Sequence, residues 1–380
     1  MDNLRPAHSR MTRAQFRQQH FLNLKMFSND LQEALNNAQP SGGNFKSVEV
    51  LALRFENDTM GVEHLERELL DVFQSVYHYN TSSFVIPVIH SEDHLNQHLI
   101  KWSLDRAQKE TLRIYVYSGH GAPAGTTDMT WWIGGQVDAH GNLRGPRVNI
   151  KALLYSCERF DGEVLYIFDC CSAGSIAMRD GPEALTACGW EQESSTHPDW
   201  SFTRVLIDTL KDIKGQPTPV CEIFSRMYRL CQQNQIGRCP LHIPKMGRPS
   251  ITLRPLHTAS TCPIQPARSH DRVLLCITLN GEVSVPSIQE WQRWLTTNVP
   301  ADVLGVEVKV EAAFSGSCKL LITVPVEIWT MLPLRDNYHF VAYVTSNNTL
   351  DTGTPLPYRP AAPSGRENRP LSRDPGKQIQ

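Results

Sequence analysis

The sequence lacks a long hydrophobic run, and this absence limits how the chain can relate to a membrane. No apolar stretch approaches the roughly 20 residues that a membrane-spanning helix needs. The first twenty residues, MDNLRPAHSRMTRAQFRQQH, also lack the apolar centre of a secretory signal peptide. We therefore expect a cytoplasmic protein without a membrane span.

The chain also lacks a strong excess of charge of either sign. It has 37 basic and 39 acidic side chains among its 380 residues, for a formal net charge of −2. Proteins that follow a phosphate backbone usually carry a marked basic field, so we expect no nucleic-acid partner. A chain of this length with 41% hydrophobic residues can bury at least one large core.

Cysteine is sparse, at ten residues unevenly spread along the chain, which excludes a disulfide framework. We expect these side chains to be thiols. Cys231, Cys239 and His242 lie close in sequence, but their spacing matches no common zinc pattern, and we predict no metal site there. A glycine-rich phosphate loop followed by Lys and Ser or Thr is also absent, which argues against nucleotide hydrolysis.

What the sequence does contain is an alternation of short apolar runs and amphipathic stretches. Residues 1–44 form an N-terminal extension whose apolar side chains recur at helical spacing. From there, β-branched runs alternate with stretches that have one apolar face, which predicts an α/β domain over 45–256 with a mostly parallel sheet covered by helices on both faces. Strands are expected at 48–55, 84–89, 111–117, 163–171 and 250–256, and helices at 61–79, 94–110, 149–160, 202–213 and 220–233.

The composition changes after residue 256. A segment rich in Pro, Ser and Thr at 257–270 indicates a linker. Residues 271–346 then follow the order βαββαβ, with the first helix at 286–298, which is the split arrangement of ferredoxin-like α+β domains. Residues 347–380 are polar and rich in proline, which predicts a disordered tail.

Two predicted strands end in turns that contain side chains capable of catalysis, a histidine in one and a cysteine in the other. YVYSGHG carries His120, and YIFDCCSAGS carries Cys171. Open α/β sheets bind ligands at the carboxyl ends of their strands, so we expect these two side chains to meet there. A histidine beside a cysteine can take the thiol proton, and the resulting thiolate attacks a carbonyl carbon. Taken singly, His120 could be an ordinary turn histidine and Cys171 a buried structural thiol.

The two turns together make the chain resemble the caspase and metacaspase cysteine peptidases. SGHG after one strand and D-x-C-x-x-G after the next match that clan, and Cys171 follows His120 by 51 positions, close to the separation of about 50 in caspases. The layout is similar to fungal caspase-like proteins with an additional C-terminal α/β domain. The sequence departs from the metacaspase turn D-x-C-H-S-G at Ser172 and Ala173.

The resemblance implies a role for each residue of the two turns. Cys171 is the nucleophile, His120 is the general base and acid, and Cys170 points back toward the core. The backbone N–H groups of Gly121 and Cys171 form the oxyanion hole, which fits the need for fixed donors where negative charge develops. The implied function is a cysteine endopeptidase that cleaves protein substrates and needs no cofactor, with calcium as an activator in many metacaspases.

Carboxylates near the turns bear on substrate specificity. In metacaspases the residue matching Asp169 lies in the pocket for the residue before the scissile bond, so the resemblance implies cleavage after Arg or Lys. Charge repulsion argues against cleavage after aspartate. Glu56 and Asp58, after the first strand, could add a second carboxylate to that substrate-binding pocket, or could cap the helix that follows.

Other features leave alternatives open. The segment 175–200 reads as one long loop, and Arg179 within it is a candidate autocleavage site. Trp131 and Trp132 could belong to the core or to the wall of the cleft, while His140 and His242 are expected to be solvated loop residues. The competing function is a catalytically inactive caspase-like scaffold in signalling or regulated cell death, whose C-terminal domain binds a partner.

Overall fold

In this computed structural model the described residues are 26–27, 29–34, 45–123, 130–171, 173–176, 181–188, 201–233, 240–256, 272–278, 308–314, 319–333 and 335–344. Ser172, Arg179, Cys239, the linker 257–270, the helix expected at 286–298 and the tail 347–380 lie outside them.

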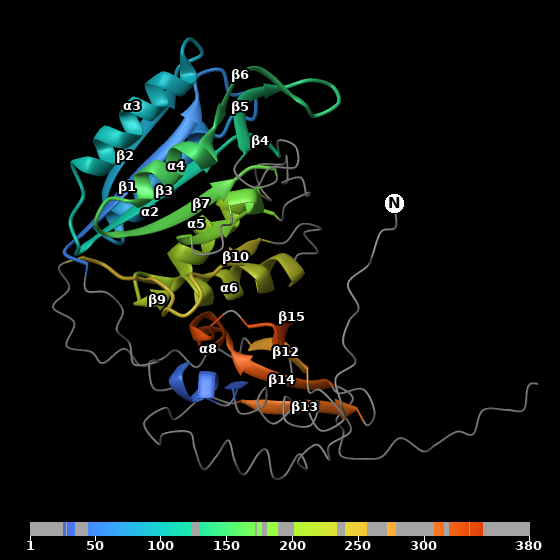
Figure 1. The fold of residues 1–380 in the computed structure, drawn as a ribbon. Helices are drawn as coiled ribbons and strands as arrows, with labels where there is room; N and C mark the ends of the chain where they lie inside the picture. Colours follow the sequence, from blue (N-terminus) through green and yellow to red (C-terminus); the bar gives the residue numbers. More distant parts are fainter. Residues whose placement is uncertain are drawn as a thin grey trace, which may run out of the picture. The chain divides into compact units, whose positions relative to one another are not determined.

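A six-stranded sheet forms the centre of the fold (Figure 1). Its strand order is β10-β8-β7-β3-β1-β2, and the five strands from β8 to β2 are parallel, while β10 is antiparallel to β8. The predicted α/β class with a mostly parallel sheet is therefore confirmed. The strands are β1 (Ser47–Phe55), β2 (Asn80–Ile86), β3 (Thr111–Ser118), β7 (Glu163–Asp169), β8 (Glu183–Thr186) and β10 (Leu241–Ile243).

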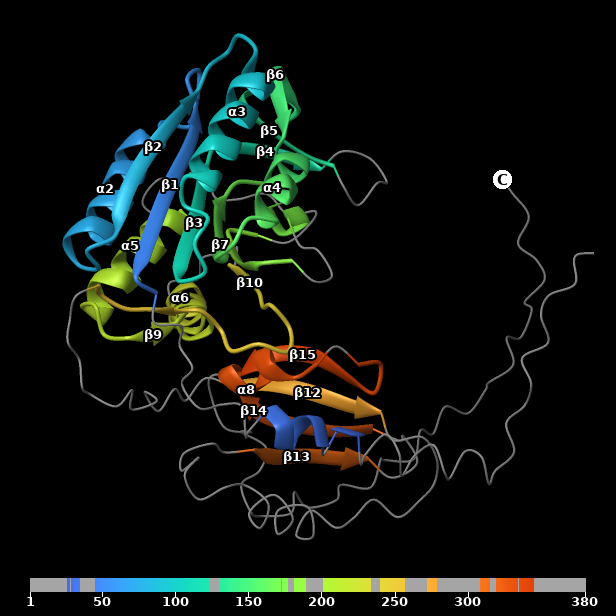
Figure 2. The same ribbon diagram turned by 60° about the vertical axis from the view of Figure 1, so that its left-hand side comes forward.

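Helices cover both faces of this sheet, as Figure 2 shows for α2 and α5 on one side of β1 and α3 and α4 on the other. The cause is the alternation of side chains along buried strands. In β1, Val48, Val50 and Ala52 join one buried cluster with α2, α5 and α6, while Leu51, Leu53 and Phe55 join the cluster that includes α3 and α4. These helices are α2 (Glu63–Ser75), α3 (Ser91–Leu104), α4 (Ile150–Glu158), α5 (Phe202–Ile213) and α6 (Val220–Gln233).

A second, three-stranded antiparallel sheet contains the segment around TWWIGG, which the sequence led us to expect as a loop because no predicted strand or helix covers it. It consists of β4 (His120–Pro123), β5 (Trp131–Val137) and β6 (Leu143–Asn149), in the order β4-β5-β6. The expectation was wrong because the glycine pair at 134–135 weakens the local β signal, whereas the actual strand is stabilised by two pairing partners.

Short and edge strands account for the other differences. The 175–200 segment contains β8, which pairs with β7, so it is not one continuous loop. Strand β2 begins four residues before the apolar run and ends before Pro87, because an edge strand accepts Asn, Thr and Ser on its exposed side. Of the strand expected at 250–256, only β11 (Thr252–Leu253) forms, and it pairs with β9 (Thr218–Pro219) outside the main sheet.

His242 is not a solvated loop residue, as expected, but lies in β10 with its side chain fully buried. Its Nε2 lies 2.7 Å from Oε1 of Glu183, which is 2% exposed. The same carboxylate accepts hydrogen bonds from the Ser250 hydroxyl and the Ile251 backbone N–H. A buried carboxylate needs such partners, so this cluster ties the edge of the main sheet to the segment that follows β10.

The C-terminal region forms a four-stranded antiparallel sheet in the order β13-β14-β12-β15. With helix α8 between the third and fourth strands, the described elements follow the predicted βαββαβ order apart from its first helix. Strand β15 also contacts helix α6, where the rings of Tyr343 and Phe224 lie 4.6 Å apart. The elements are β12 (Arg272–Thr278), β13 (Lys309–Phe314), β14 (Lys319–Pro325), α8 (Val326–Met331) and β15 (Tyr338–Val344).

The described part of the N-terminal extension is helical and packs on this C-terminal sheet, as Figure 2 shows for the short blue helix beside β12 and β14. Phe27 contacts the ring of Tyr338 edge-on at 5.2 Å, and Asp30 accepts hydrogen bonds from Arg335. Phe27 and Leu31 are completely buried. Sequence periodicity predicted the helix, but it does not indicate which sheet a helix contacts.

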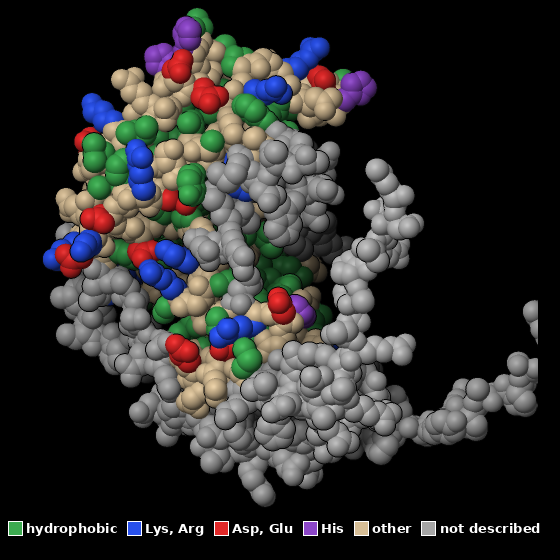
Figure 3. Space-filling view, in the orientation of Figure 1, with side chains coloured by type: hydrophobic (Ala, Val, Ile, Leu, Met, Phe, Trp, Pro, Cys, Tyr) green, Lys and Arg blue, Asp and Glu red, His purple; other side chains and the backbone are tan. Residues whose placement is uncertain are grey.

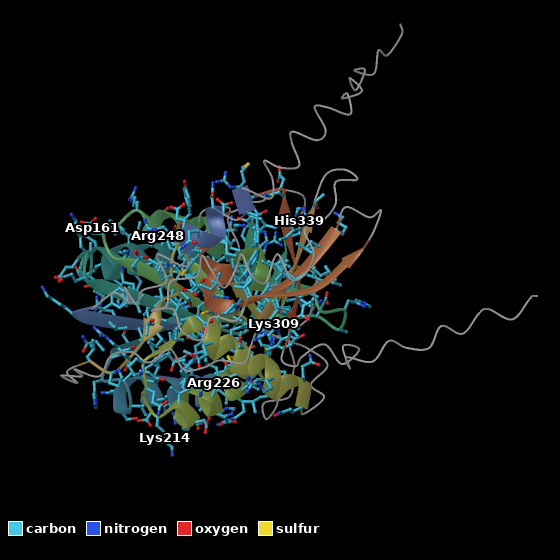
Figure 4. All side chains as sticks on the ribbon, turned by 90° about the horizontal axis from the view of Figure 1, so that it is seen from below. Asp161, Lys214, Arg226, Arg248, Lys309 and His339 are labelled. Carbon is cyan, nitrogen blue, oxygen red and sulfur yellow. The ribbon has the colours of Figure 1, made fainter. Side chains whose placement is uncertain are left out.

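The described surface carries no large field of one sign on the face that Figure 3 shows, where basic and acidic side chains are interspersed. Many of them pair locally. Arg226, labelled on α6 in Figure 4, lies 2.7 Å from Glu222 one turn earlier. Among the described helices, none is both long enough and apolar enough to cross a membrane.

Candidate active site

The turns that contain His120 and Cys171 follow neighbouring strands of the main sheet. Strands β3 and β7 are parallel neighbours, and their register ends with Ser118 opposite Asp169. The backbone N–H of Gly119 then donates to the Asp169 carbonyl at 3.1 Å, which joins the turns just beyond the strands. His120 and Cys171 therefore follow adjacent strand ends at the carboxyl edge of the sheet.

Two glycines allow this close approach. A Cβ atom at Gly121 would lie 2.6 Å from the carbonyl oxygen of Cys171 and 3.1 Å from the Cys170 sulfur, so the backbone of one turn lies directly against the other. Gly119 has a φ of +148°, and a Cβ there would meet the Tyr117 hydroxyl at 2.7 Å. Both positions exclude larger side chains for steric reasons.

The adjacent cysteines differ sharply in environment. Cys170 is completely buried among apolar side chains, and this burial raises its pKa well above the usual thiol value. Cys171 is half-buried, at the first position beyond the core. The predicted inward orientation of Cys170 is thus confirmed. Because the thiolate is the reactive species, a thiol whose pKa is raised by burial is a poor nucleophile, which leaves Cys171 as the reactive candidate.

His120 is held in place by a residue that sequence reasoning missed. Its Nε2 lies 3.0 Å from the hydroxyl oxygen of Thr59, and that hydroxyl donates to the Gly135 carbonyl at 3.4 Å. With the Thr59 proton used in this way, the Thr59 oxygen accepts a hydrogen bond from the Nε2–H group. Nδ1 then becomes the basic nitrogen of the neutral imidazole.

The electrostatic surroundings favour the neutral form of His120. Partial burial lowers its pKa from the usual value, while the negative charge of Asp58 opposes that effect. An imidazole whose pKa lies below its ordinary value is unprotonated at neutral pH and can accept a proton. The buried hydroxyl of Tyr117 also donates a hydrogen bond to the backbone carbonyl of His120 at 2.8 Å, which holds the backbone of the turn in place.

The carboxylates after the first strand make other contacts. Asp58 Oδ2 accepts a hydrogen bond from the Val62 backbone N–H at 3.2 Å, just before helix α2, which agrees with the capping alternative. Its second oxygen, Oδ1, is buried and has no hydrogen-bond partner among the described residues. Glu56 accepts a hydrogen bond from the Val88 backbone N–H at 3.1 Å and so bridges two strand ends.

Asp169 points toward helix α5. Its Oδ2 accepts hydrogen bonds from the backbone N–H of Thr203 at 3.0 Å and from the Thr203 hydroxyl at 2.7 Å. The side chain is 9% exposed, and burial raises its pKa against the opposing effect of these hydrogen bonds. Asp169 thus ties the turn that contains Cys171 to the start of α5, and its contact with a substrate stays a prediction.

Valine at position 59 has nearly the same shape as threonine but no hydroxyl. For any hydrolysis in which His120 acts as the base, we expect Thr59→Val to lower kcat/KM by about tenfold, the scale of one lost hydrogen bond. The acid limb of the pH profile should move to lower pH. Without an acceptor for the Nε2 proton the imidazolium is harder to form, and the pKa of His120 falls further. Thr59→Ser should restore both values. An unchanged profile in Thr59→Val would show that the contact does not orient His120.

Comparisons with known proteins give only distant similarities. No protein-family model matches the chain, and no curated protein sequence matches it. Among solved structures, caspase-1 from Spodoptera frugiperda is 11% identical, with a TM-score of 0.39 over 54% of this chain and 90% of that chain. The Drosophila initiator caspase Dronc is 11% identical, with a TM-score of 0.35 over 53% and 80%. A protein from Geobacter sulfurreducens is 13% identical, with a TM-score of 0.38 over 52% and 92%.

The described residues contain no cluster of three or more His, Cys, Asp and Glu side chains arranged to hold a metal ion. Cys231 and His242, considered above as metal ligands, are both buried, and His242 is bound to Glu183.

Proposed function

We propose that the chain is a cysteine endopeptidase of the caspase and metacaspase type. The observation that carries the proposal is the apposition of the two turns, in which Gly121 lies against the backbone of Cys171 and His120 is held by Thr59. A half-buried thiol in the turn next to that of an oriented, neutral histidine supports this proposal, because nucleophilic catalysis by cysteine requires a base within reach of the thiol.

The proposed reaction proceeds through an acyl-enzyme. His120 takes the proton of the Cys171 thiol, and the thiolate attacks the carbonyl carbon of the scissile peptide bond. The resulting imidazolium then donates its proton to the leaving amine as the C–N bond breaks. Water, deprotonated by His120, attacks the thioester in the second half of the reaction and releases the carboxylic acid product with the thiol restored.

The backbone N–H groups of Gly121 and Cys171 are proposed to bind the oxyanion of each tetrahedral intermediate. Their turns are joined by the Gly119 hydrogen bond to Asp169, so the two donors keep a fixed separation without the cost of ordering a loop during the reaction. Such preorganised donors commonly lower the barrier by several kcal/mol.

We further propose cleavage after Arg or Lys, with Asp169 at the base of the pocket. The carboxylate uses Oδ2 for both hydrogen bonds to Thr203, so Oδ1 is the atom through which it would meet a basic side chain. A carboxylate whose pKa is raised by burial benefits from a cationic partner, because the ion pair offsets its desolvation. Asp58, whose buried Oδ1 accepts no hydrogen bond among the described residues, is a second proposed contact.

The test is hydrolysis of fluorogenic peptides that end in Arg, Lys, Gln or Asp, measured with and without calcium. We expect the wild-type protein to cleave the Arg and Lys peptides at least about tenfold faster than the Gln peptide, the selectivity that one buried charge pair can supply. Calcium dependence would support activation of the kind that the metacaspase resemblance implies.

Asp169→Asn is the matched variant, because the amide oxygen can still accept both hydrogen bonds from Thr203. The preference for Arg over Gln should disappear while cleavage of the Gln peptide persists. Preferential Asp cleavage would contradict the pocket assignment. No cleavage of any peptide, combined with slow alkylation of Cys171 at pH 6, would favour the inactive scaffold whose C-terminal domain binds a partner.

Arg179 remains our proposed autocleavage site. It lies in the connection between the nucleophile turn and strand β8, outside the described residues. A basic residue there matches the proposed specificity for Arg or Lys.

A further inference from the structure

The three-stranded sheet that begins at His120 has two chemically different faces. Directly opposed residues of antiparallel strands place their side chains on the same face, and consecutive residues alternate between faces. One face carries Trp131, Ile133 and Val148, which are all completely buried in the core beside α4. This settles the alternatives for the tryptophan pair, because Trp131 is core and Trp132 must face the other way.

The opposite face carries the proposed catalytic base. His120 pairs with Gly134, which in turn pairs with Arg147, so His120 and Arg147 share one face. Trp132, two residues before Gly134, lies on that face as well and pairs with Ala122. The register shift between β5 and β6 comes only after Gly134 and does not disturb this alignment.

Trp132 and Arg147 form one unit. The guanidinium carbon of Arg147 lies 4.9 Å from the centre of the Trp132 ring, Trp132 is half-buried, and Arg147 is exposed. A guanidinium stacked on an indole is held in a defined position. The N–H groups at its edge remain able to bind a carboxylate through two parallel hydrogen bonds. Among the described carboxylates, none forms an ion pair with Arg147.

The residue between His120 and Arg147 has no side chain. Gly134 is buried beneath Leu143, whose side chain lies 3.2 Å from the Cβ position of Gly134, so an extended peptide that runs from the base to the guanidinium would pass over Leu143. Adjacent strands lie about 4.8 Å apart, so two strand spacings separate the backbones of His120 and Arg147 by about 10 Å. An extended peptide advances about 3.3 Å per residue, so this span corresponds to two or three residues.

We propose that Trp132 and Arg147 form a subsite for an acidic side chain of the substrate, two or three residues beyond the scissile bond. The inference rests on the proposed function. In that reaction Cys171 retains the acyl half, while the leaving amine receives its proton from His120, so the residues after the scissile bond lie on the His120 side.

The experiment uses internally quenched peptides with Arg before the scissile bond and Glu, Gln or Lys at the second and third positions after it. The wild-type protein should prefer Glu over Gln by about three- to fivefold in kcat/KM, the scale of an exposed ion pair, and should disfavour Lys. Arg147→Ala should remove this preference. Arg144→Ala is the matched control, an exposed arginine on the same strand outside the stacked pair, and should keep it.

A peptide with a coumarin directly after Arg separates this subsite from the active site, since it has no residues to place there. Its cleavage should be the same in the wild type and in Arg147→Ala. Equal rates for Glu and Gln peptides, or an equal loss in Arg144→Ala, would overturn the subsite.

If no peptide is cleaved, the proposed function fails, and the subsite is tested by binding instead. Dye-labelled forms of the same peptides are titrated with the Cys171→Ala protein, and their fluorescence anisotropy is measured. Tighter binding of the Glu peptide, lost on adding Arg147→Ala, supports the subsite, and equal binding overturns it.

Discussion

Replacement of Cys171 by alanine should lower hydrolysis of an Arg-ending peptide by at least about a thousandfold, whereas Cys170→Ala should retain most of the activity. The two sulfurs are neighbours in sequence but differ in environment. Burial raises the pKa of Cys170 well above the usual thiol value, and the side chain has no exposed surface. Cys171 is half-buried beside the turn of His120.

The two variants differ by one position, which makes each the control for the other. Cys170→Ala leaves a small cavity in the core and should cost about 1 to 2 kcal/mol of stability, so both proteins are assayed well below their unfolding temperatures. Iodoacetamide labelling at pH 6, followed by mass spectrometry, should modify Cys171 first in the wild type and in Cys170→Ala. Activity that survives Cys171→Ala but not Cys170→Ala would reverse the assignment of the nucleophile.

The central strands and the long amphipathic helices could be predicted from the sequence because their signals are local. Strand β7 is buried on both faces and appears as a continuous apolar run, and helix α6 occupies the predicted residues 220–233. Strand β8, with only EALT, carries too few residues to show a period. It is a strand because β7 and β10 pair with it on both sides, which is information that no short window contains.

The same distinction applies to the candidate site. His120 and Cys171 each follow a buried strand in a recognisable turn, so the adjacency of these two turns could be predicted from strand order. Thr59 lies 61 residues from His120 in sequence and follows a strand as an ordinary loop residue. Only the parallel pairing of β1 and β3 brings the two loops together, so no local pattern indicates the contact.

Asp169 has a structural contact with helix α5 as well as a proposed role in substrate binding. The resemblance to metacaspases implies a pocket acid at this position, and in the structure its Oδ2 accepts hydrogen bonds from the backbone N–H and the hydroxyl of Thr203 at the start of α5. Removing the side chain would therefore affect both the nucleophile turn and the helix. Asp169→Asn separates these two roles, because the amide oxygen still accepts the hydrogen bonds from Thr203 while the negative charge of the proposed pocket is removed.

Replacement of Gly121 by alanine should lower kcat by about a hundred- to a thousandfold, which is the effect of losing an oxyanion-hole donor. The added Cβ would lie 2.6 Å from the Cys171 carbonyl oxygen, a main-chain atom that cannot rotate away. The two turns must move apart, and this changes the separation of both proposed donors. The rearranged packing should also cost about 1 to 3 kcal/mol of stability.

Gly141→Ala is the control for destabilisation alone. Gly141 has a φ of +80° with open space around its Cβ position, so alanine there strains the backbone by about 1 to 2 kcal/mol without reaching the strand ends. We expect its kcat to match that of the wild type. Thiol labelling at pH 6 should remain fast in Gly121→Ala if the loss comes from the donors. Slow labelling together with low kcat would instead mean that the alanine separates Cys171 from His120, and the oxyanion role of Gly121 would then lose its support.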